Sequence, residues 1–373
     1  MGYALNEDWG EGHVGQMQGD VFILNVSNGK VNKVCIPNHL HCLDVQWSPG
    51  NKGLIFTGYD NTIKYGLAHC FNRKCALYYV EMKEDMAISK TIAVCLTPKD
   101  ATARSPRVSP DGRWIAYLST EAVVTHNTCS ALRLLAWNSD GPSKSPRTLV
   151  DIVRESNLDD KFSGLYAGSL PKKCWSGDST HLFFNTLHRS RPTWYMVSVT
   201  NGSLLSDSEY PEMENYGSAV FWDASETHLL IEVASPDTLP GLVLLPLKKE
   251  DEAVTIVQPR SSPYIASWTV VQMDPTVPLQ TVQTPAPTTP STDLPQVKTL
   301  CTSDATYEAI LCIPASTKPK NGWPLLLDIH GGPHGAAPSG YKTLNAFYAA
   351  HGIAICIVNY RGSIGFGKKA LGR

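Results

Sequence analysis

The sequence predicts a mainly β fold, in which a partial β-propeller is followed by a shorter α/β segment. Three observations predict it. A strand-and-turn unit recurs four times, a second type of strand alternates with it, and a proline-rich run separates these repeats from a stretch in which strands alternate with a helix. With 373 residues, the chain is long enough for two domains of ~100–200 residues each.

The first repeated unit consists of an apolar position, a turn and a short strand. Its turns use proline, glycine, serine or aspartate, and its strands are rich in aromatic and β-branched residues, which favour pleated structure. The four copies begin at Gln46, Arg107, Cys174 and Phe221. The second unit is a strand that ends in Asn-Gly, a hairpin signal, and it is clearest in 21–29 and 194–202.

Two strand types that alternate along a chain indicate propeller blades of about four strands each. The alternative is a β-sandwich in which the internal similarity is accidental. The first strand, near Val21, matches the end of a blade. The sequence therefore predicts about four and a half blades in a chain that opens in mid-blade, and such a propeller exposes strand edges.

A change in composition marks the predicted domain boundary. Residues 274–298 contain six prolines among threonine, glutamine and serine, a composition typical of an extended linker. We therefore predict a partial propeller in 1–273, a linker in 274–298 and the incomplete N-terminal part of an α/β domain in 299–373.

The last segment has the alternating pattern of an α/β sheet. We expect strands at 309–313, 325–329 and 354–358, and a helix over 343–351 that ends at Gly352. The strand at 354–358 is apolar throughout, which predicts burial on both faces.

The strand at 325–329 runs directly into a glycine motif. Its residues are His330, Gly331, Gly332 and Pro333. A strand followed by His-Gly-Gly is typical of the oxyanion loop of α/β-hydrolases, because glycine lets backbone N–H groups approach a developing oxyanion. The alternative is an ordinary glycine turn. With this motif the predicted fold is mainly β, a partial β-propeller followed by the first strands of an α/β-hydrolase domain.

A second motif follows the strand at 354–358. It consists of Asn359, Tyr360, Arg361, Gly362 and Ser363. Together the two motifs resemble the prolyl oligopeptidase family of serine peptidases, which couples a propeller to an α/β-hydrolase domain. Within that family the chain is most similar to the acylaminoacyl-peptidase branch, to which the propeller stretches 7–11 and 174–176 also point.

This resemblance implies an activity. Members of the branch remove N-acylated, often N-acetylated, amino acids from the N-terminus of short peptides, and they use a Ser-Asp-His triad with no cofactor and no metal ion. Mammalian members are cytoplasmic homotetramers. By the same resemblance, the N–H of Gly332 would belong to the oxyanion hole, and Arg361 with its motif would be structural.

The chain departs from the family at the catalytic triad. No G-x-S-x-G nucleophile elbow occurs in the sequence, and the triad of these folds follows the oxyanion loop in the order Ser, Asp, His. Ser363 is followed by neither Asp nor His, so it is not expected to be a nucleophile. We therefore expect no catalytic residue in this chain, a sequence truncated at both ends relative to the family, and no activity of the chain alone.

Two other functions stay open. The chain could be a non-catalytic propeller module that associates with itself or with full-length subunits, or a fragment of a related dipeptidyl-peptidase.

The composition excludes other classes of partner. With 32 Lys+Arg against 34 Asp+Glu there is no basic excess for binding nucleic acid. No apolar run approaches the ~18 residues of a membrane span. The histidines and cysteines lack zinc spacing, and ten scattered cysteines after an acidic N-terminus indicate a cytoplasmic protein.

Overall fold

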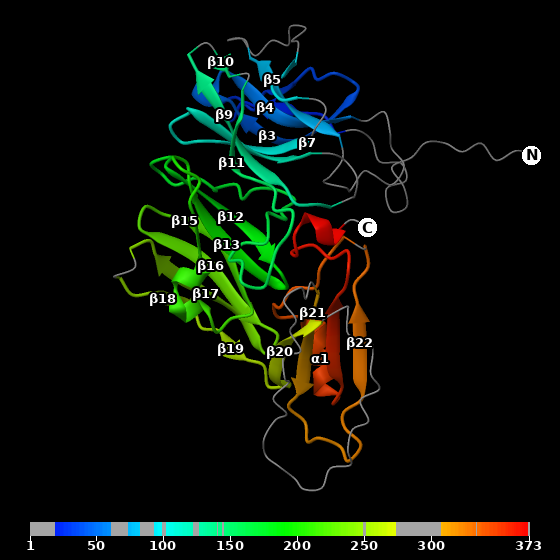
Figure 1. Ribbon diagram of the computed structural model, residues 1–373. Helices are drawn as coiled ribbons and strands as arrows, with labels where there is room; N and C mark the ends of the chain where they lie inside the picture. The colour runs from blue at the N-terminus through cyan, green and yellow to red at the C-terminus, as the bar shows by residue number, and fades with distance from the viewer. Residues whose placement is uncertain are drawn as a thin grey trace, which may run out of the picture.

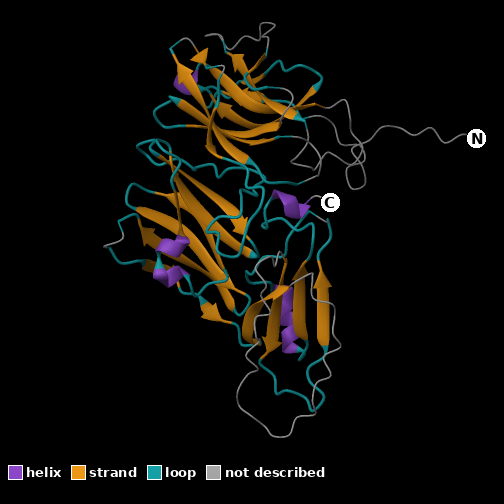
Figure 2. Ribbon diagram, viewed as in Figure 1, coloured by secondary structure: helices purple, strands orange, loops and turns teal. Residues whose placement is uncertain are grey.

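The structure is a computed structural model that describes residues 19–60, 74–82, 93–98, 102–121, 127–139, 141–143, 145–248, 251–273, 307–332 and 334–371. The described elements are mostly strands, with a single α-helix among them (Figure 2). The strands form successive blades, and a separate C-terminal sheet lies beside the later blades (Figure 1). The prediction of a mainly β fold is confirmed.

The first half of the described chain is a hairpin followed by two blades. The hairpin pairs β1 (Phe22–Leu24) with β2 (Val31–Lys33). Blade one contains β3 (Leu40–Trp47), β4 (Gly53–Asp60), β5 (Cys75–Glu81) and β6 (Val94–Cys95). Blade two contains β7 (Thr102–Val108), β8 (Trp114–Thr120), β9 (Ala131–Asn138), β10 (Gly141–Pro142) and β11 (Arg147–Val150). One parallel pair, Cys75 with Thr102, joins the two blades into a nine-stranded sheet.

The next two blades are separate antiparallel sheets. Blade three contains β12 (His181–His188), β13 (Arg191–Ser198) and β14 (Leu204–Ser206). Blade four contains β15 (Ser218–Ala224), β16 (His228–Ser235), β17 (Thr238–Pro246), β18 (Val254–Val257) and β19 (Arg260–Ser261). Short 3-10 helices occur at Pro49–Asn51, Asp207–Glu209, Pro211–Met213 and Lys368–Leu371. Each of the four repeat units predicted from the sequence lies in a blade of its own. The hairpin of β1 and β2 corresponds to the partial blade predicted at the start of the chain.

Neighbouring blades pack through apolar clusters. Ile55 and Ile115 are fully buried in a cluster shared by blades one and two. In β12, Phe184 belongs to the cluster shared with blade two, whereas Phe183 belongs to the cluster shared with blade four. Successive side chains of a strand point to opposite faces, so a single strand can contribute to both neighbouring interfaces. The alternation of side chains between the two faces of a strand thus lets each blade pack against the blade before it and the blade after it.

The C-terminal sheet has four strands in the order β20-β21-β23-β22. These are β20 (Ile265–Met273), β21 (Tyr307–Pro314), β22 (Leu325–Ile329) and β23 (Ala354–Asn359). β22 and β23 are parallel, and the helix α1 (Thr343–Ala350) connects them, as a parallel pair requires. The strands and the helix predicted for this segment are confirmed.

One expectation for this sheet was wrong. The strand at 354–358 was expected to be buried on both faces, but only Ile355 and Ile357 are fully buried in the cluster under α1, while Cys356 and Val358 are half-buried. The reason is that the described residues place a helix over one face alone. On the edge strand β22, Leu325, Leu327 and Ile329 are 55–60% exposed.

The division between domains stays a prediction, because the linker expected at 274–298 lies outside the described residues. The strand before it, β20, pairs antiparallel with β21 from Ile265 to Met273. A strand on the N-terminal side of the predicted linker therefore belongs to the C-terminal sheet. Within the described part of the chain, no helix is long and apolar enough to cross a membrane.

Candidate functional site

The structure brings the two predicted motifs together at the end of β22. His330 follows this strand directly, and its ring stacks on Tyr360 with the ring centroids 4.5 Å apart. The Tyr360 hydroxyl donates to the His330 carbonyl oxygen at 2.5 Å, and Ser363 Oγ lies 2.8 Å from His330 Nε2. Two residues of the second motif thus hold the first residue of the glycine motif.

The two glycines after His330 differ in backbone conformation. Both are exposed, and Gly332 has a φ of 133°, in the region that favours glycine. A Cβ built on Gly331 meets nothing within 4 Å. The fourth residue of the predicted loop, Pro333, lies outside the described residues. Only Gly332 therefore needs to be glycine for its conformation, and this is the position whose N–H was assigned to the oxyanion hole.

The loop is also held beyond the glycines. Asn359 is fully buried, and its side chain bonds Ala337 in both directions: Oδ1 accepts from the amide at 2.7 Å and Nδ2 donates to the carbonyl at 2.9 Å. His334 Nε2 lies 3.1 Å from the Leu371 carbonyl oxygen. The last residue of β23 therefore determines the position of the loop that follows β22, the neighbouring parallel strand.

Two further residues of the second motif, Arg361 and Ser363, differ from each other in solvent exposure. Ser363 is fully buried, whereas Arg361 is exposed. The amide of Gly362 donates to the Ala370 carbonyl, and Gly362 has a φ of 105°. After the motif, Ile364 and Leu371 pack in a cluster with Cys129 and Tyr166, so the end of the chain contacts the blades. The exclusion of Ser363 as a nucleophile and the roles of both motifs stay predictions.

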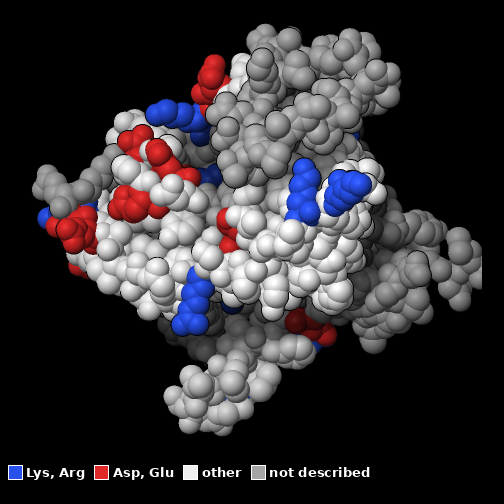
Figure 3. Space-filling model, turned by 90° about the horizontal axis from the view of Figure 1, so that it is seen from below, with Lys and Arg blue, Asp and Glu red and all other residues white. Residues whose placement is uncertain are grey.

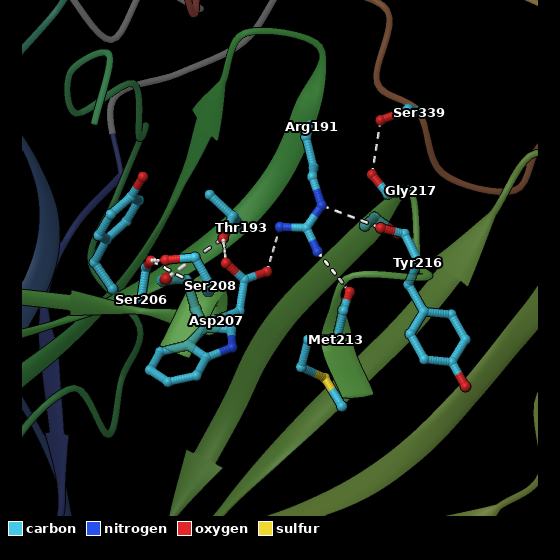
Figure 4. Close-up of polar contacts among 12 residues, drawn as sticks. Arg191, Thr193, Ser206, Asp207, Ser208, Met213, Tyr216, Gly217 and Ser339 are labelled. Atoms are coloured by element: carbon cyan, nitrogen blue, oxygen red, sulfur yellow. Dashed lines mark hydrogen bonds and ion pairs between the residues drawn. The ribbon is translucent and has the colours of Figure 1, made fainter. Parts of the chain in front are cut away.

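The loop that begins at His330, after β22, contacts the blades at Ser339. Its Oγ lies 2.7 Å from the Gly217 carbonyl oxygen and 3.0 Å from that of Ser190, and its amide donates to the same Ser190 oxygen. Figure 4 shows the Ser339 side chain directed at Gly217. A Cβ on Gly217 would lie 2.1 Å from the Ser339 carbonyl oxygen, so a larger residue would force the two segments apart.

An arginine on β13 holds the segment before Gly217. Arg191 donates to the carbonyl oxygens of Met213 and Tyr216 at 3.0 and 3.1 Å, and it pairs with the Asp207 carboxylate (Figure 4). Thr193 donates to the other oxygen of that carboxylate at 2.7 Å. The buried carboxylate thus orients the guanidinium, which fixes the approach of blade four to the loop.

A buried ion pair lies beside this contact. Arg189 Nε is 2.5 Å from Glu308 Oε1, and the two side chains are 7% and 4% exposed. Ser190 donates to Glu308 Oε2 from its hydroxyl at 2.5 Å and its amide at 3.1 Å, and Gln272 donates to Oε1. Burial alone would raise the pKa of Glu308, but Arg189 and these donors bring the pKa below its ordinary value. The carboxylate is therefore ionised and satisfied inside the protein.

Sequence reasoning did not find these contacts. Arg189 and Ser190 form a hairpin turn with no motif, Arg191 begins the strand after it, and Glu308 is one acidic residue at the start of an apolar strand. A charged residue in such a strand is the signal available from the sequence, because an apolar strand buries a charge only with a partner. Among the described residues, no group of three or more His, Cys, Asp or Glu could hold a metal ion.

Known proteins are similar to this chain in sequence and in fold. The profile described as "Acylamino-acid-releasing enzyme, N-terminal domain" matches residues 3–273. The chain belongs to the acylamino-acid-releasing enzyme family. The acylamino-acid-releasing enzyme of Mus musculus is 29% identical over 381 residues, which cover 99% of this chain and 47% of the mouse protein. The chain thus spans about half the length of the curated relatives it matches.

Solved structures agree on the fold. A puromycin-hydrolyzing peptidase of Mycobacterium tuberculosis matches with a TM-score of 0.57 and 14% identity, covering 92% of this chain and 45% of that one. A prolyl endopeptidase matches with a TM-score of 0.54 and 11% identity, covering 95% of this chain and 52% of the other. The assignment to the acylaminoacyl branch is confirmed, and the solved structures share the fold that this assignment implies.

Proposed function

We propose that this chain is the propeller and oxyanion-loop part of a serine peptidase that removes N-acylated amino acids from the N-terminus of short peptides. One observation carries the proposal: His330 is held by Tyr360 and Ser363 at the end of a parallel strand, in a member of the acylamino-acid-releasing enzyme family. The names of the relatives support the substrate class. The reaction needs no cofactor or metal, and a cytoplasmic location suits such peptides.

In this role the chain supplies binding groups, and the nucleophile comes from elsewhere. The backbone N–H group of Gly332 would polarise the scissile carbonyl, which is how an oxyanion donor stabilises acyl transfer. The stacked Tyr360 and the Ser363 hydroxyl keep the loop in the conformation that presents it. The blades would restrict entry to small peptides.

Peptide titration tests the proposal. We expect an N-acetylated tripeptide to bind the purified chain at least about tenfold more tightly than the same tripeptide with a free amino group, measured by calorimetry, because a buried ammonium without a partner is unfavourable. Gly332→Ala should weaken this binding, since alanine is strained at its φ, while Gly331→Ala should leave it unchanged. Preference for the free amine would instead favour the dipeptidyl-peptidase alternative, and equal or absent binding would contradict the proposal.

A second function, association with copies of this chain or with full-length subunits, is favoured by one observation. The edge strand β22 exposes Leu325, Leu327 and Ile329, and an edge strand can pair with another chain. Much of the described surface seen from below carries no charged side chain (Figure 3). We expect purified chain to form a homo-oligomer that Leu327→Lys converts to monomer in analytical ultracentrifugation. A monomeric parent chain would contradict this.

A further inference from the structure

The turn between β12 and β13 has a strained backbone. His188 pairs with Arg191, so Arg189 and Ser190 form a two-residue hairpin turn. Arg189 has a φ of 56°, a conformation for which hairpin turns usually use glycine or asparagine. A residue in such a conformation persists only where its surroundings hold it, and such residues gather at functional positions.

The C-terminal part of the chain holds this turn. The amide of Arg189 donates to the Gly365 carbonyl at 2.9 Å, and its guanidinium lies 4.9 Å from the centre of the Phe366 ring. A Cβ on Gly365 would lie 2.4 Å from the Arg189 carbonyl oxygen, so the two backbones are in close contact. With the Arg189–Glu308 ion pair, the C-terminal part of the chain contacts both the backbone and the side chain of Arg189.

Ser190 connects the turn to the loop. Its hydroxyl donates to Glu308 and accepts from Asn359 Nδ2 at 2.9 Å, while its carbonyl oxygen accepts from the Ser339 amide. Asn359 in turn bonds both backbone groups of Ala337. Ser190 is 2% exposed, so water cannot replace these bonds. Ser190 therefore bonds the far end of the loop directly at Ser339, beside the bond from Ser339 to Gly217, and supports Asn359, the residue that bonds Ala337.

We propose that Ser190 is a positioning residue: blade three, through its hydroxyl and carbonyl, sets the far end of the loop that begins with His330, Gly331 and Gly332. The near end is held by Tyr360 and Ser363, inside the C-terminal part of the chain. A movement of blade three away from the C-terminal sheet then breaks the bonds of Ser190 to Ser339 and Asn359 and loosens the far end of the loop. The consequence for an oxyanion hole rests on the proposed function; the coupling itself does not.

Hydrogen–deuterium exchange of the full chain tests this coupling. In Ser190→Ala, peptides covering 330–342 should exchange about tenfold faster or more, because Asn359 and Glu308 each lose a buried partner. Peptides from β16 and β17 should be unchanged. Ser190→Thr keeps the hydroxyl and should restore slow exchange. Ser339→Ala removes only the side-chain bonds to Ser190 and Gly217 and should give a smaller rise in the same peptides.

The matched control is Ser206→Ala. Ser206 is a buried serine of the same blade, and its hydroxyl bonds Ser208 rather than the C-terminal part of the chain (Figure 4). Unchanged exchange at 330–342 in both Ser190→Ala and Ser339→Ala would overturn the proposal, and so would an equal rise in Ser206→Ala. Because the readout is exchange, a failed peptide titration would refute the proposed function and leave this result standing.

Discussion

The purified chain is expected to release no product from an N-acetylalanyl anilide and to take no fluorophosphonate label at any serine. The physical reason is that an acyl transfer needs an activated nucleophile, and the sequence contains no G-x-S-x-G elbow. Removing a triad leaves at most the contribution of the oxyanion hole and of binding, which is ~10³–10⁴-fold over water in a site that is otherwise complete. The expected loss relative to a complete enzyme is therefore several orders of magnitude.

Among the described residues of the candidate site, Ser363 is the serine that lies beside a histidine, so it is the position to examine in the labelling experiment. Its Oγ lies 2.8 Å from His330 Nε2, within the range of a nucleophile and its base, but the residue is fully buried. Ser363→Ala should therefore leave the absence of labelling unchanged. The mouse acylamino-acid-releasing enzyme is the positive control. A label mapped to Ser363, with turnover abolished by the same reagent, would show that the buried pair opens and acts as a dyad.

Glu308→Ala is expected to destabilise the protein by about 3–5 kcal/mol, because it leaves the buried Arg189 guanidinium without its counter-charge. The measurement is the free energy of unfolding in urea, followed by tryptophan fluorescence. Lys369→Ala is the matched control: it removes an ion pair with Glu155 whose side chains are 70% and 61% exposed, so the change should stay within about 0.5 kcal/mol. Equal changes in the free energy of unfolding for the two substitutions would contradict a stabilising role of the buried Arg189–Glu308 ion pair.

The pH dependence of stability checks the same carboxylate. Because the pKa of Glu308 is lowered in the folded protein, its ionised form contributes stability above the pKa of an unfolded glutamate, about 4.3. This contribution is lost as the pH falls through the lower, folded-state pKa. Glu308→Gln does not titrate, so it should lose less stability than the parent chain below about pH 4. Parallel curves for the two proteins would show that the pKa of Glu308 is not lowered.

Local sequence determined the strands, the turns and the identity of the two motifs. The repeated units around Trp47 and Trp175, for example, predicted the blades because turn residues and β-branched runs act over a few neighbouring positions. His-Gly-Gly after an apolar strand predicted the loop at 330–332 for the same reason. The proximity of Tyr360 and Ser363 to His330 was not predicted; it follows from the parallel pairing of β22 with β23, because both motifs come after these neighbouring strands.

Only the tertiary structure decided how the blades meet the C-terminal sheet. Ser190 and Glu308 are 118 positions apart, and Asn359 bonds Ser190 over 169 positions, so no local pattern relates them. A buried charge or hydroxyl is tolerated where its partners converge on it in three dimensions, and those partners come from separate strands. The one-sided burial of β23 has the same origin: an apolar run specifies that a strand can be buried, and the packed neighbours decide which face is.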